Sequence, residues 1–254
     1  MAAACSTDRL AVASPLKSVT EEYRITPIAD RIAILASGGL DSSVLLGQIA
    51  RKGRHVFPVY IRAGLAWEAD ELRTLRRFVR ALKISNVEPV TLLRLPMGDL
   101  AGDHWSMTGR NVPGYYAGPS SNYILGRNLS LLTKAAIFCA RNRIGEIAMA
   151  PLESNPFPDA RPEFFRAFAR AVELGVGIKL RIVTPFAGLT KGDVVRRGAG
   201  MPLHLTLSCA RPHGTMHCGA CTKCAERVEG FMLAGVPDPT RYARKPKPPK
   251  LLHG

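Results

Sequence analysis

The middle of the chain alternates short apolar runs with longer stretches in which apolar residues recur every three or four positions. The short runs predict buried strands, and the recurring pattern predicts amphipathic helices. The predicted strands cover residues 31–36, 55–61, 87–95, 146–150 and 179–184. The predicted helices cover residues 43–50, 68–83 and 128–141, together with a segment that buries Phe164, Phe165, Phe168 and Val172.

Strands that alternate with helices form right-handed strand–helix–strand units and a parallel sheet. We therefore predict a Rossmann-like α/β domain over residues 30–200, with helices on both faces of the sheet. Within it, residues 97–124 are rich in Gly, Pro, Asn, Ser and Tyr and are predicted to be a long loop. Residues 1–29 are an N-terminal extension, residues 201–235 a small metal-binding module, and residues 236–254 a basic, Pro-rich arm that is extended and solvated.

A glycine-rich turn lies between the first predicted strand and the first predicted helix. It reads Ser37-Gly38-Gly39-Leu40-Asp41-Ser42. The carboxyl end of the strand meets a helix N-terminus there, where backbone N–H groups and the helix dipole favour an anion. The turn lacks the lysine of a Walker A sequence and the third glycine of a dinucleotide fingerprint. A plain capped turn remains the simpler alternative, because Asp41 and Ser42 also favour helix starts.

Four of the six cysteines fall within sixteen residues, at Cys209, Cys218, Cys221 and Cys224. Closely spaced cysteine pairs in a protein of the reducing cytosol favour a metal over disulfides. Four thiolates complete a tetrahedral Zn²⁺ site with no open position, so the predicted role is structural. An iron–sulfur cluster and a redox disulfide remain alternatives. The neighbouring His213 and His217 are alternative ligands that four cysteines make unnecessary.

The charge and the hydropathy limit the classes of protein. Lys and Arg outnumber Asp and Glu by 35 to 20, for a net charge of +15 at pH 7. Such a surface attracts nucleotides, nucleic acids or an acidic partner. The first thirty residues have no unbroken apolar core of signal-peptide length, and no apolar run is long enough to cross a bilayer. We therefore expect a cytoplasmic protein.

Several motifs, in order, resemble those of a known family. The turn matches SGGxDS, the signature of PP-loop ATP pyrophosphatases, and together with the cysteine spacing it resembles the QueC family, the 7-cyano-7-deazaguanine synthases of queuosine biosynthesis. Further matches are Leu125–Asn128 to the family's V-P-G-R-N and Phe157–Phe164 to its Y-P-D-C-R-P-E-F. Thr184–Phe186 with Thr190–Asp193 resembles its T-P-L…K-x-[DE] segment, and Leu207–Cys209 its T-x-S-C.

The resemblance implies a reaction of ATP with Mg²⁺ on 7-carboxy-7-deazaguanine. ATP activates the carboxylate as an acyl adenylate, ammonia converts it to the amide, and a second ATP activates the amide oxygen so that the nitrile forms. The residues that the resemblance assigns to the chemistry are Asp41, Arg127, Lys191, Asp159 and Glu163. Those assigned to the nucleotide are Ala36, Ser37, Gly38, Gly39, Leu40, Asp41, Ser42, Ser43, Gly126, Arg127 and Lys191. A homodimer is also expected.

Three of the assigned substrate residues, Lys191, Asp159 and Glu163, have simpler alternatives. Arg127, Lys191 and Arg161 are cations for phosphates or the substrate carboxylate, although Lys191 also fits a solvated helix start. Asp159 and Glu163 are expected to read the guanine-like edge or to take the ammonia proton. The alternatives are a turn residue for Asp159 and a residue that favours the helix dipole for Glu163.

One stretch departs from the family pattern. After the second strand the family carries a motif of the type Asp-Tyr-Gly-Gln-Arg-His, whereas residues 60–68 here read YIRAGLAWE. Glu68 stands where the family has a later glutamate, but the Gln-Arg-His part is missing. A relative that stops at the amide, or that joins the carboxylate to another amine such as a protein N-terminus in a defence system, is therefore a second hypothesis.

Two further classes remain as rivals. A PP-loop enzyme that thiolates tRNA would use the basic surface to bind RNA, but it needs a reactive cysteine that four zinc ligands do not leave. The isolated Cys139 lies on the apolar face of a predicted helix and is expected in the core. A zinc-ribbon nucleic-acid binder would leave the glycine-rich turn without a role, and aromatic residues are only 7% of the chain.

Overall fold

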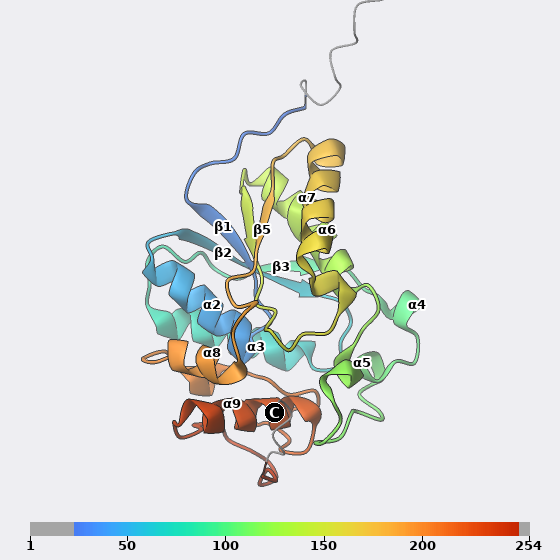
Figure 1. The fold of residues 1–254 in the computed structure, drawn as a ribbon, viewed down its shortest axis with the longest axis vertical. Helices are drawn as coiled ribbons and strands as arrows, with labels where there is room; N and C mark the ends of the chain where they lie inside the picture. Colours follow the sequence, from blue (N-terminus) through green and yellow to red (C-terminus); the bar gives the residue numbers. More distant parts are fainter. Residues whose placement is uncertain (1–22, 249–254) are drawn as a thin grey trace, which may run out of the picture.

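The computed structural model describes residues 23–248, and Cys5, most of the N-terminal extension and the end of the basic tail lie outside this range. One sheet of five parallel strands has the order β3-β2-β1-β4-β5 (Figure 1). The fold class predicted from the sequence is therefore confirmed. The strands are β1 (Arg31–Leu35), β2 (His55–Arg62), β3 (Thr91–Arg94), β4 (Glu146–Ala148) and β5 (Arg181–Val183).

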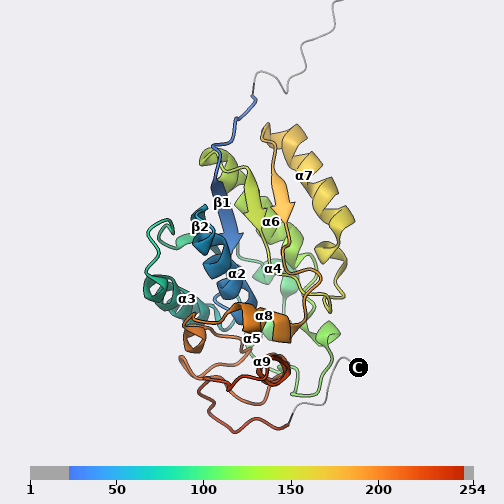
Figure 2. The same ribbon diagram turned by 60° about the vertical axis from the view of Figure 1, so that its left-hand side comes forward.

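Helices cover both faces of the sheet, as predicted (Figures 1 and 2). Residues from α2, α3 and α8 pack into one hydrophobic core, and residues from α6 and α7 pack into a second core on the opposite face. The helices are α2 (Leu40–Arg51), α3 (Glu68–Leu82), α4 (Gly98–Ala101), α5 (Trp105–Thr108), α6 (Arg127–Arg141), α7 (Pro162–Val176), α8 (Lys191–Arg197) and α9 (Thr222–Ala234), with 3-10 turns η1 (Pro119–Asn122), η2 (Pro158–Ala160) and η3 (Leu203–Leu205).

The order in which strands are added to the sheet reverses between β1 and β4, although all the strands are parallel. From β1 the chain extends to β2 and then β3 on one side, whereas β4 and β5 lie on the other. A crevice opens at such a point outside the carboxyl ends of the strands, and open parallel sheets bind their ligands there. The glycine-rich turn leaves β1 at this point, and the cysteine segment, residues 207–224, leads into α9, which lies below the sheet in Figure 1.

Residues 97–124 are more ordered than a long loop. They contain α4, α5 and η1, and side chains from this segment join the cysteine segment in a third hydrophobic core. Two local signals account for the short helices: the His104 ring accepts the N–H of Ser106 at the start of α5, and Pro119 opens η1. The segment predicted to be one long loop therefore contains three short elements, which the sequence did not reveal because each is too short to show a periodic pattern.

Both ends of the described chain are held by backbone hydrogen bonds. The Ile25 N–H donates to the Gly177 carbonyl (2.8 Å), beside α7. At the other end, the tail runs extended and exposed, but His217 exchanges backbone hydrogen bonds with Arg241 and Ala243. The Tyr115 hydroxyl also donates to the Lys247 carbonyl (2.7 Å). The basic tail therefore lies along the cysteine segment up to that residue.

None of the helices in residues 23–248 is long and apolar enough to cross a membrane. Most of the buried side chains come from the sheet and from the helix faces turned toward it, and the largest fully buried one is Arg227 on α9.

We expect Leu75→Ala to lower the free energy of unfolding by about 2–5 kcal/mol, because it leaves a cavity under the sheet. Leu75 is 0% exposed and contacts the backbone of the glycine-rich turn. Urea denaturation measures the loss. The control is Leu174→Ala on α7, whose side chain is 55% exposed and should cost less than about 0.5 kcal/mol. Equal losses in the two variants would contradict the packing described here.

Candidate functional site

The glycine-rich turn is shaped by close packing and by its own hydroxyl groups. Gly38 has φ +77°, and a Cβ there would lie 2.8 Å from the Glu71 carbonyl oxygen, so only glycine fits. The Ser42 hydroxyl accepts the Ser37 N–H and lies 3.1 Å from the Ser37 hydroxyl. The first turn of α2 follows at once, and its leading N–H groups lack partners within the helix. The turn is therefore built for an anion.

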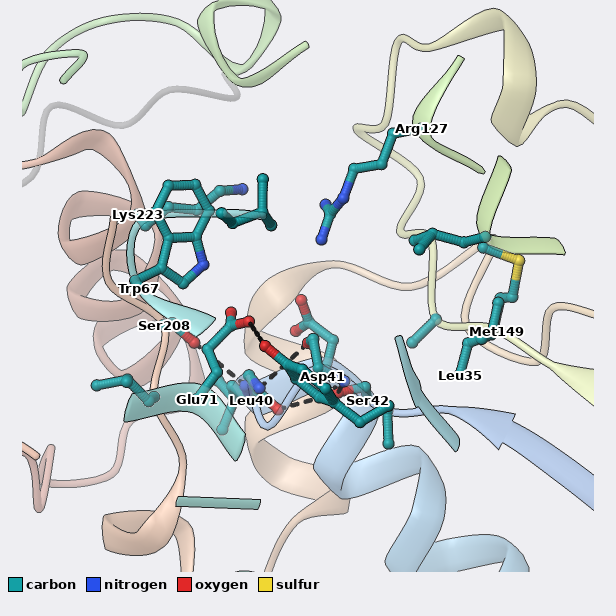
Figure 3. Close-up of a pocket in the computed structure, with 18 of the residues that line it drawn as sticks. Leu35, Leu40, Asp41, Ser42, Trp67, Glu71, Arg127, Met149, Ser208 and Lys223 are labelled. Atoms are coloured by element: carbon teal, nitrogen blue, oxygen red, sulfur yellow. Dashed lines mark hydrogen bonds between the residues drawn. The ribbon is translucent and has the colours of Figure 1, made fainter. Parts of the chain in front are cut away.

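A cavity of about 270 Å³ opens above this turn (Figure 3). Its walls come from the carboxyl ends of β1, β2 and β4, from the starts of α2, α6 and α8, and from the segment that leads into the cysteines. Of the residues assigned to the nucleotide, the lining includes Ala36, Ser37, Gly39, Leu40, Asp41, Ser42, Arg127 and Lys191. Ser43 is fully buried in α2, and Gly126 precedes α6 in the left-handed conformation with φ 65°.

Lys191 and Asp41 form an ion pair at the edge of this cavity. The Lys191 ammonium lies 2.8 and 2.6 Å from the two carboxylate oxygens of Asp41. Thr190 and Asp193 cap α8 reciprocally and so fix the position of Lys191. Burial alone would lower the pKa of Lys191, but Asp41 and Glu226 outweigh it and raise the pKa. The pair thus offers a permanent cation for phosphate and a carboxylate for a divalent ion.

Arg127 reaches into the cavity from the start of α6 (Figure 3). Its buried Nε has no hydrogen-bond partner among residues 23–248. The Asp159 carboxylate accepts the Asn128 N–H (2.9 Å) and the Asn128 side-chain amide (3.2 Å), which fixes the beginning of the helix. The structure therefore brings Arg127 to Asp41 and Lys191, and it places Asp159 behind Arg127 rather than in the cavity lining.

Glu163 and Arg161 lie away from the cavity. The Glu163 side chain is 74% exposed and pairs with Arg166 one turn along α7 (3.2 Å). A hydrogen bond to its own backbone and the nearby Arg166 lower the pKa of Glu163. Arg161 precedes α7 and is exposed. Their proposed roles toward the substrate are not supported by contact with this cavity.

Two cavity residues went unrecognised in the sequence. Glu71 and Tyr60 meet at the floor of the cavity, where the Tyr60 hydroxyl donates to a Glu71 carboxylate oxygen (2.9 Å). Burial raises the pKa of Glu71 to about 7, against opposing effects of Arg127 and of the hydrogen bond from Tyr60. A signal existed, because Glu71 is four residues before Leu75 and therefore shares the apolar face of α3.

The departing stretch after β2 is organised by Glu68. Its buried carboxylate accepts the backbone N–H groups of Ala63 and Gly64 and lies 3.5 Å from the Arg62 guanidinium. This turn presents Trp67 to the cavity, and the Trp67 ring stacks on Trp105 with centroids 5.6 Å apart. An aromatic wall therefore stands where the family motif would place polar side chains.

The four cysteines converge on one point. Their sulfur atoms all lie within 4.8 Å of one another, and all four residues are buried. The Cys218 and Cys221 sulfurs are 3.8 and 3.5 Å from that of Cys224. Ligands at about 2.3 Å in a tetrahedron are about 3.8 Å apart, which matches. The cluster is thus the right size for one zinc ion.

Backbone donors around the sulfurs fit a metal site as well. The N–H groups of Arg211 and Cys218 point at the Cys209 sulfur (3.4 and 3.3 Å), and that of Ala220 points at the Cys218 sulfur (3.4 Å). Such hydrogen bonds stabilise thiolates, the form that binds metal. Cys209, Cys218, Cys221 and Cys224 would hold Zn²⁺, which would link the loop before α9 to its first turn. His213 and His217 contribute no ligand to this cluster.

The cysteine segment is bonded directly to the glycine-rich turn. The Leu207 N–H donates to the Gly38 carbonyl (2.8 Å), and the Ser208 hydroxyl accepts the Leu40 N–H (3.1 Å). Ser208 thereby caps the start of α2 from a position 168 residues away. Lys223, between two of the cysteines, also lines the cavity (Figure 3). The segment that carries the cysteine cluster therefore supports the anion-binding turn.

A parallel sheet with an SGGxDS turn at its reversal point and a four-cysteine cluster beside it defines a nucleotide-binding protein of the PP-loop type. The model of the queuosine biosynthesis protein QueC matches residues 31–235. The chain belongs to this QueC family, as its motifs predicted.

Curated relatives agree over most of the chain. The 7-cyano-7-deazaguanine synthase of Acetivibrio thermocellus is 30% identical over 234 residues, covering 85% of this chain and 99% of that protein. That of Anaeromyxobacter sp. strain Fw109-5 is 34% identical over 227 residues, covering 85% and 97%. A solved 4-thiouridine synthetase–RNA complex with bound ATP is 13% identical with a TM-score of 0.45, covering 84% of this chain and 47% of that one. This last similarity is loose, and the family assignment does not need it.

We expect Cys221→Ser to lose the bound metal and to lower the melting temperature, because structural zinc contributes folding free energy directly. Metal analysis of the purified protein, together with thermal unfolding, checks this. The control is Cys139→Ser, which changes a buried cysteine outside the cluster and should keep about one zinc per chain. A Cys221→Ser protein with full stability would contradict a structural metal.

Proposed function

We propose that the protein uses ATP and Mg²⁺ to convert 7-carboxy-7-deazaguanine and ammonia into 7-cyano-7-deazaguanine. The observation that carries the proposal is the ion pair between Lys191, at the start of α8, and Asp41 of the SGGxDS turn, in a chain of the QueC family. A free carboxylate is a poor electrophile, and adenylation makes its carbon open to attack by an amine. The site that this chemistry needs is one that positions groups and neutralises charge.

Each residue has a role in this proposal. The turn from Ser37 to Ser42 binds the pyrophosphate part of ATP, and Lys191 neutralises the charge that builds up there. Asp41 would hold Mg²⁺, whose charge would stabilise the phosphates, and Lys191 would then pair with phosphate instead of with Asp41. Arg127 binds the α-phosphate or the substrate carboxylate from the opposite wall, which accounts for its unpaired Nε.

A second candidate is a ligase that joins the carboxylate to a larger amine. A second cavity, of about 740 Å³, adjoins the first and shares Asp41, Lys191 and Lys223 with it. Ammonia needs only about the 30 Å³ of a water molecule, so this space favours a bigger second substrate such as a protein N-terminus. The aromatic turn before α3, which replaces the family's Gln-Arg-His, points the same way.

Two observations count against a thiolating enzyme. All the cysteines of residues 23–248 other than Cys139 lie in the four-cysteine cluster, which in this proposal holds zinc. Cys139 lies on the buried face of α6 and is 0% exposed, and burial raises the pKa of its thiol to about 12. A thiol that is both inaccessible and protonated cannot carry sulfur.

We expect AMP and the nitrile when the protein is mixed with 7-carboxy-7-deazaguanine, ATP, Mg²⁺ and ammonium, as measured by mass spectrometry. AMP with the amide alone, or with a conjugate when a peptide with a free N-terminus is added, would favour the second candidate. No AMP with any of these amines would contradict both.

We expect Asp41→Asn to reduce AMP formation by at least about 100-fold, because it removes the carboxylate that positions the metal and weakens the anchor of Lys191. Its zinc content and melting temperature should stay close to those of the wild type, which separates the roles of the two sites. The matched control is Asp70→Asn, which removes a surface pair with Arg73 on α3 and should leave the rate unchanged. Loss of zinc from Asp41→Asn would contradict this division.

A further inference from the structure

Three carboxylates line the nucleotide cavity, and two of them are neutralised by lysines. Asp41 is paired with Lys191, and Glu226 accepts hydrogen bonds from Lys223 (3.2 Å) and from the Asn122 amide (3.1 Å). The third, Glu71, is 8% exposed and accepts a hydrogen bond from a neutral donor, the Tyr60 hydroxyl. Asp41 and Glu226 are thus neutralised by lysine side chains, whereas Glu71 is neutralised by taking up a proton.

The Tyr60 hydroxyl is positioned to serve Glu71 in either protonation state. It lies 2.9 Å from a Glu71 carboxylate oxygen and 3.3 Å from the Glu68 backbone carbonyl. When Glu71 is charged, Tyr60 donates to it. When Glu71 carries a proton, it can donate to the Tyr60 oxygen while Tyr60 turns its own hydrogen to the Glu68 carbonyl. Neither state leaves a buried polar group without a partner, so changing the protonation state costs little.

The charged groups around Glu71 come from three elements. Arg127 on α6 faces Glu71 across the cavity and favours its charged form (Figure 3), and the nearby Trp67 side chain also favours that form. Glu68, one turn earlier on α3, and burial favour the neutral form. Tyr60 on β2 stays protonated, because burial and the two glutamates raise its pKa. With these effects combined, the pKa of Glu71 is about 7.

We infer that Glu71 is the catalytic base that takes the proton from the attacking amine, an inference that rests on the proposed function. The amine lone pair forms a carbon–nitrogen bond to the carboxyl carbon of the acyl adenylate. The bond from that carbon to the phosphate oxygen breaks, and AMP leaves with its electron pair. One N–H proton passes to the Glu71 carboxylate and from there to water. The sum is acyl adenylate plus ammonia giving amide, AMP and a proton.

Glu71 fits this task better than the two carboxylates that the family motif highlighted. Asp159 is occupied by Asn128 behind α6, and Glu163 is exposed on α7, so neither lines the cavity. A base works best when its pKa is close to the operating pH, where it is charged often enough to accept a proton and weak enough to release it.

The test is Glu71→Gln, assayed in two half-reactions. Exchange of pyrophosphate into ATP that requires 7-carboxy-7-deazaguanine reports adenylation, a step that needs no base. We expect the exchange rate of Glu71→Gln to stay within about 3-fold of that of the wild type. Amide formation from the amine should fall by about 100-fold or more. With free ammonia held constant at every pH, the wild-type amide rate should rise through about pH 7, and this rise should be absent from Glu71→Gln. The matched control is Glu173→Gln, a half-buried position on α7 that lies outside the cavity and pairs with Arg170.

Equal losses in both half-reactions, or a Glu71→Gln variant that keeps the rise near pH 7, would overturn the inference. A wild-type protein without this exchange of pyrophosphate would instead refute the proposed function. The two failures are therefore distinguishable.

A measurement without turnover tests the site directly. In protein labelled with ¹³C at the glutamate carboxyl carbon, one resonance should titrate near pH 7 and be missing from Glu71→Gln. Tyr60→Phe should move this midpoint upward, because it removes a hydrogen bond to the charged form. A non-hydrolysable ATP analogue should also move it upward, since the added negative charge disfavours a second charge nearby. A midpoint that none of these changes alters would contradict a place for Glu71 in the site.

Discussion

The site depends on close packing around one glycine. At Gly38 the turn after β1 contacts α3 through the Glu71 backbone and the Leu75 side chain, and its carbonyl accepts the Leu207 N–H from the cysteine segment. Three parts of the chain meet at a point where even a methyl group has no room. The position of the anion-binding turn, the depth of Glu71 and the entry to the metal cluster are therefore set together, and a shift of one part moves the others.

The arrangement of charge at the site follows from this crowding. The chain carries a net charge of +15, yet the cavity lining is not uniformly positive. Its two lysines pair with Asp41 and Glu226, whereas the buried Nε of Arg127 has no hydrogen-bond partner among residues 23–248. Buried polar groups are usually satisfied, and exceptions concentrate where a ligand completes them. The wall carrying Arg127 is therefore incomplete without substrate.

Glu71 also illustrates a conflict between stability and function. Its pKa is about 7 in the folded chain against an ordinary value of 4.5, so the folded protein holds this proton more tightly than the unfolded one. The associated stability is fully present below pH 4.5 and is lost as the pH rises toward 7. A glutamine there would avoid the loss. The carboxylate persists at a position that packing alone would assign to an apolar residue, consistent with a functional requirement.

The sequence was informative where chemistry is local and uninformative where it depends on the fold. The turn at Ser37–Ser42 and the four cysteines are recognisable because each motif is contiguous. Lys191 was found through its motif, but only the sheet topology brings it to Asp41, 150 residues away. Short helices such as α4 and α5 are below the length at which a period can be recognised. Ser208 could not be assigned as the cap of α2, because a cap supplied by a distant segment leaves no local trace.

The departure from the family motif after β2 is a built feature rather than a gap in the site. The Glu68 carboxylate accepts the N–H groups of Ala63 and Gly64. These hydrogen bonds offset the free-energy cost of burying the carboxylate and hold the turn in one conformation. The shape places Trp67 against Trp105 and directs its side chain to Glu71. Basic and amide side chains have thus been replaced by an aromatic wall and a protonatable carboxyl. No cation from this turn lines the cavity among the described residues, so Arg127 on the opposite wall, at the start of α6, matters more here than the motif alone implies.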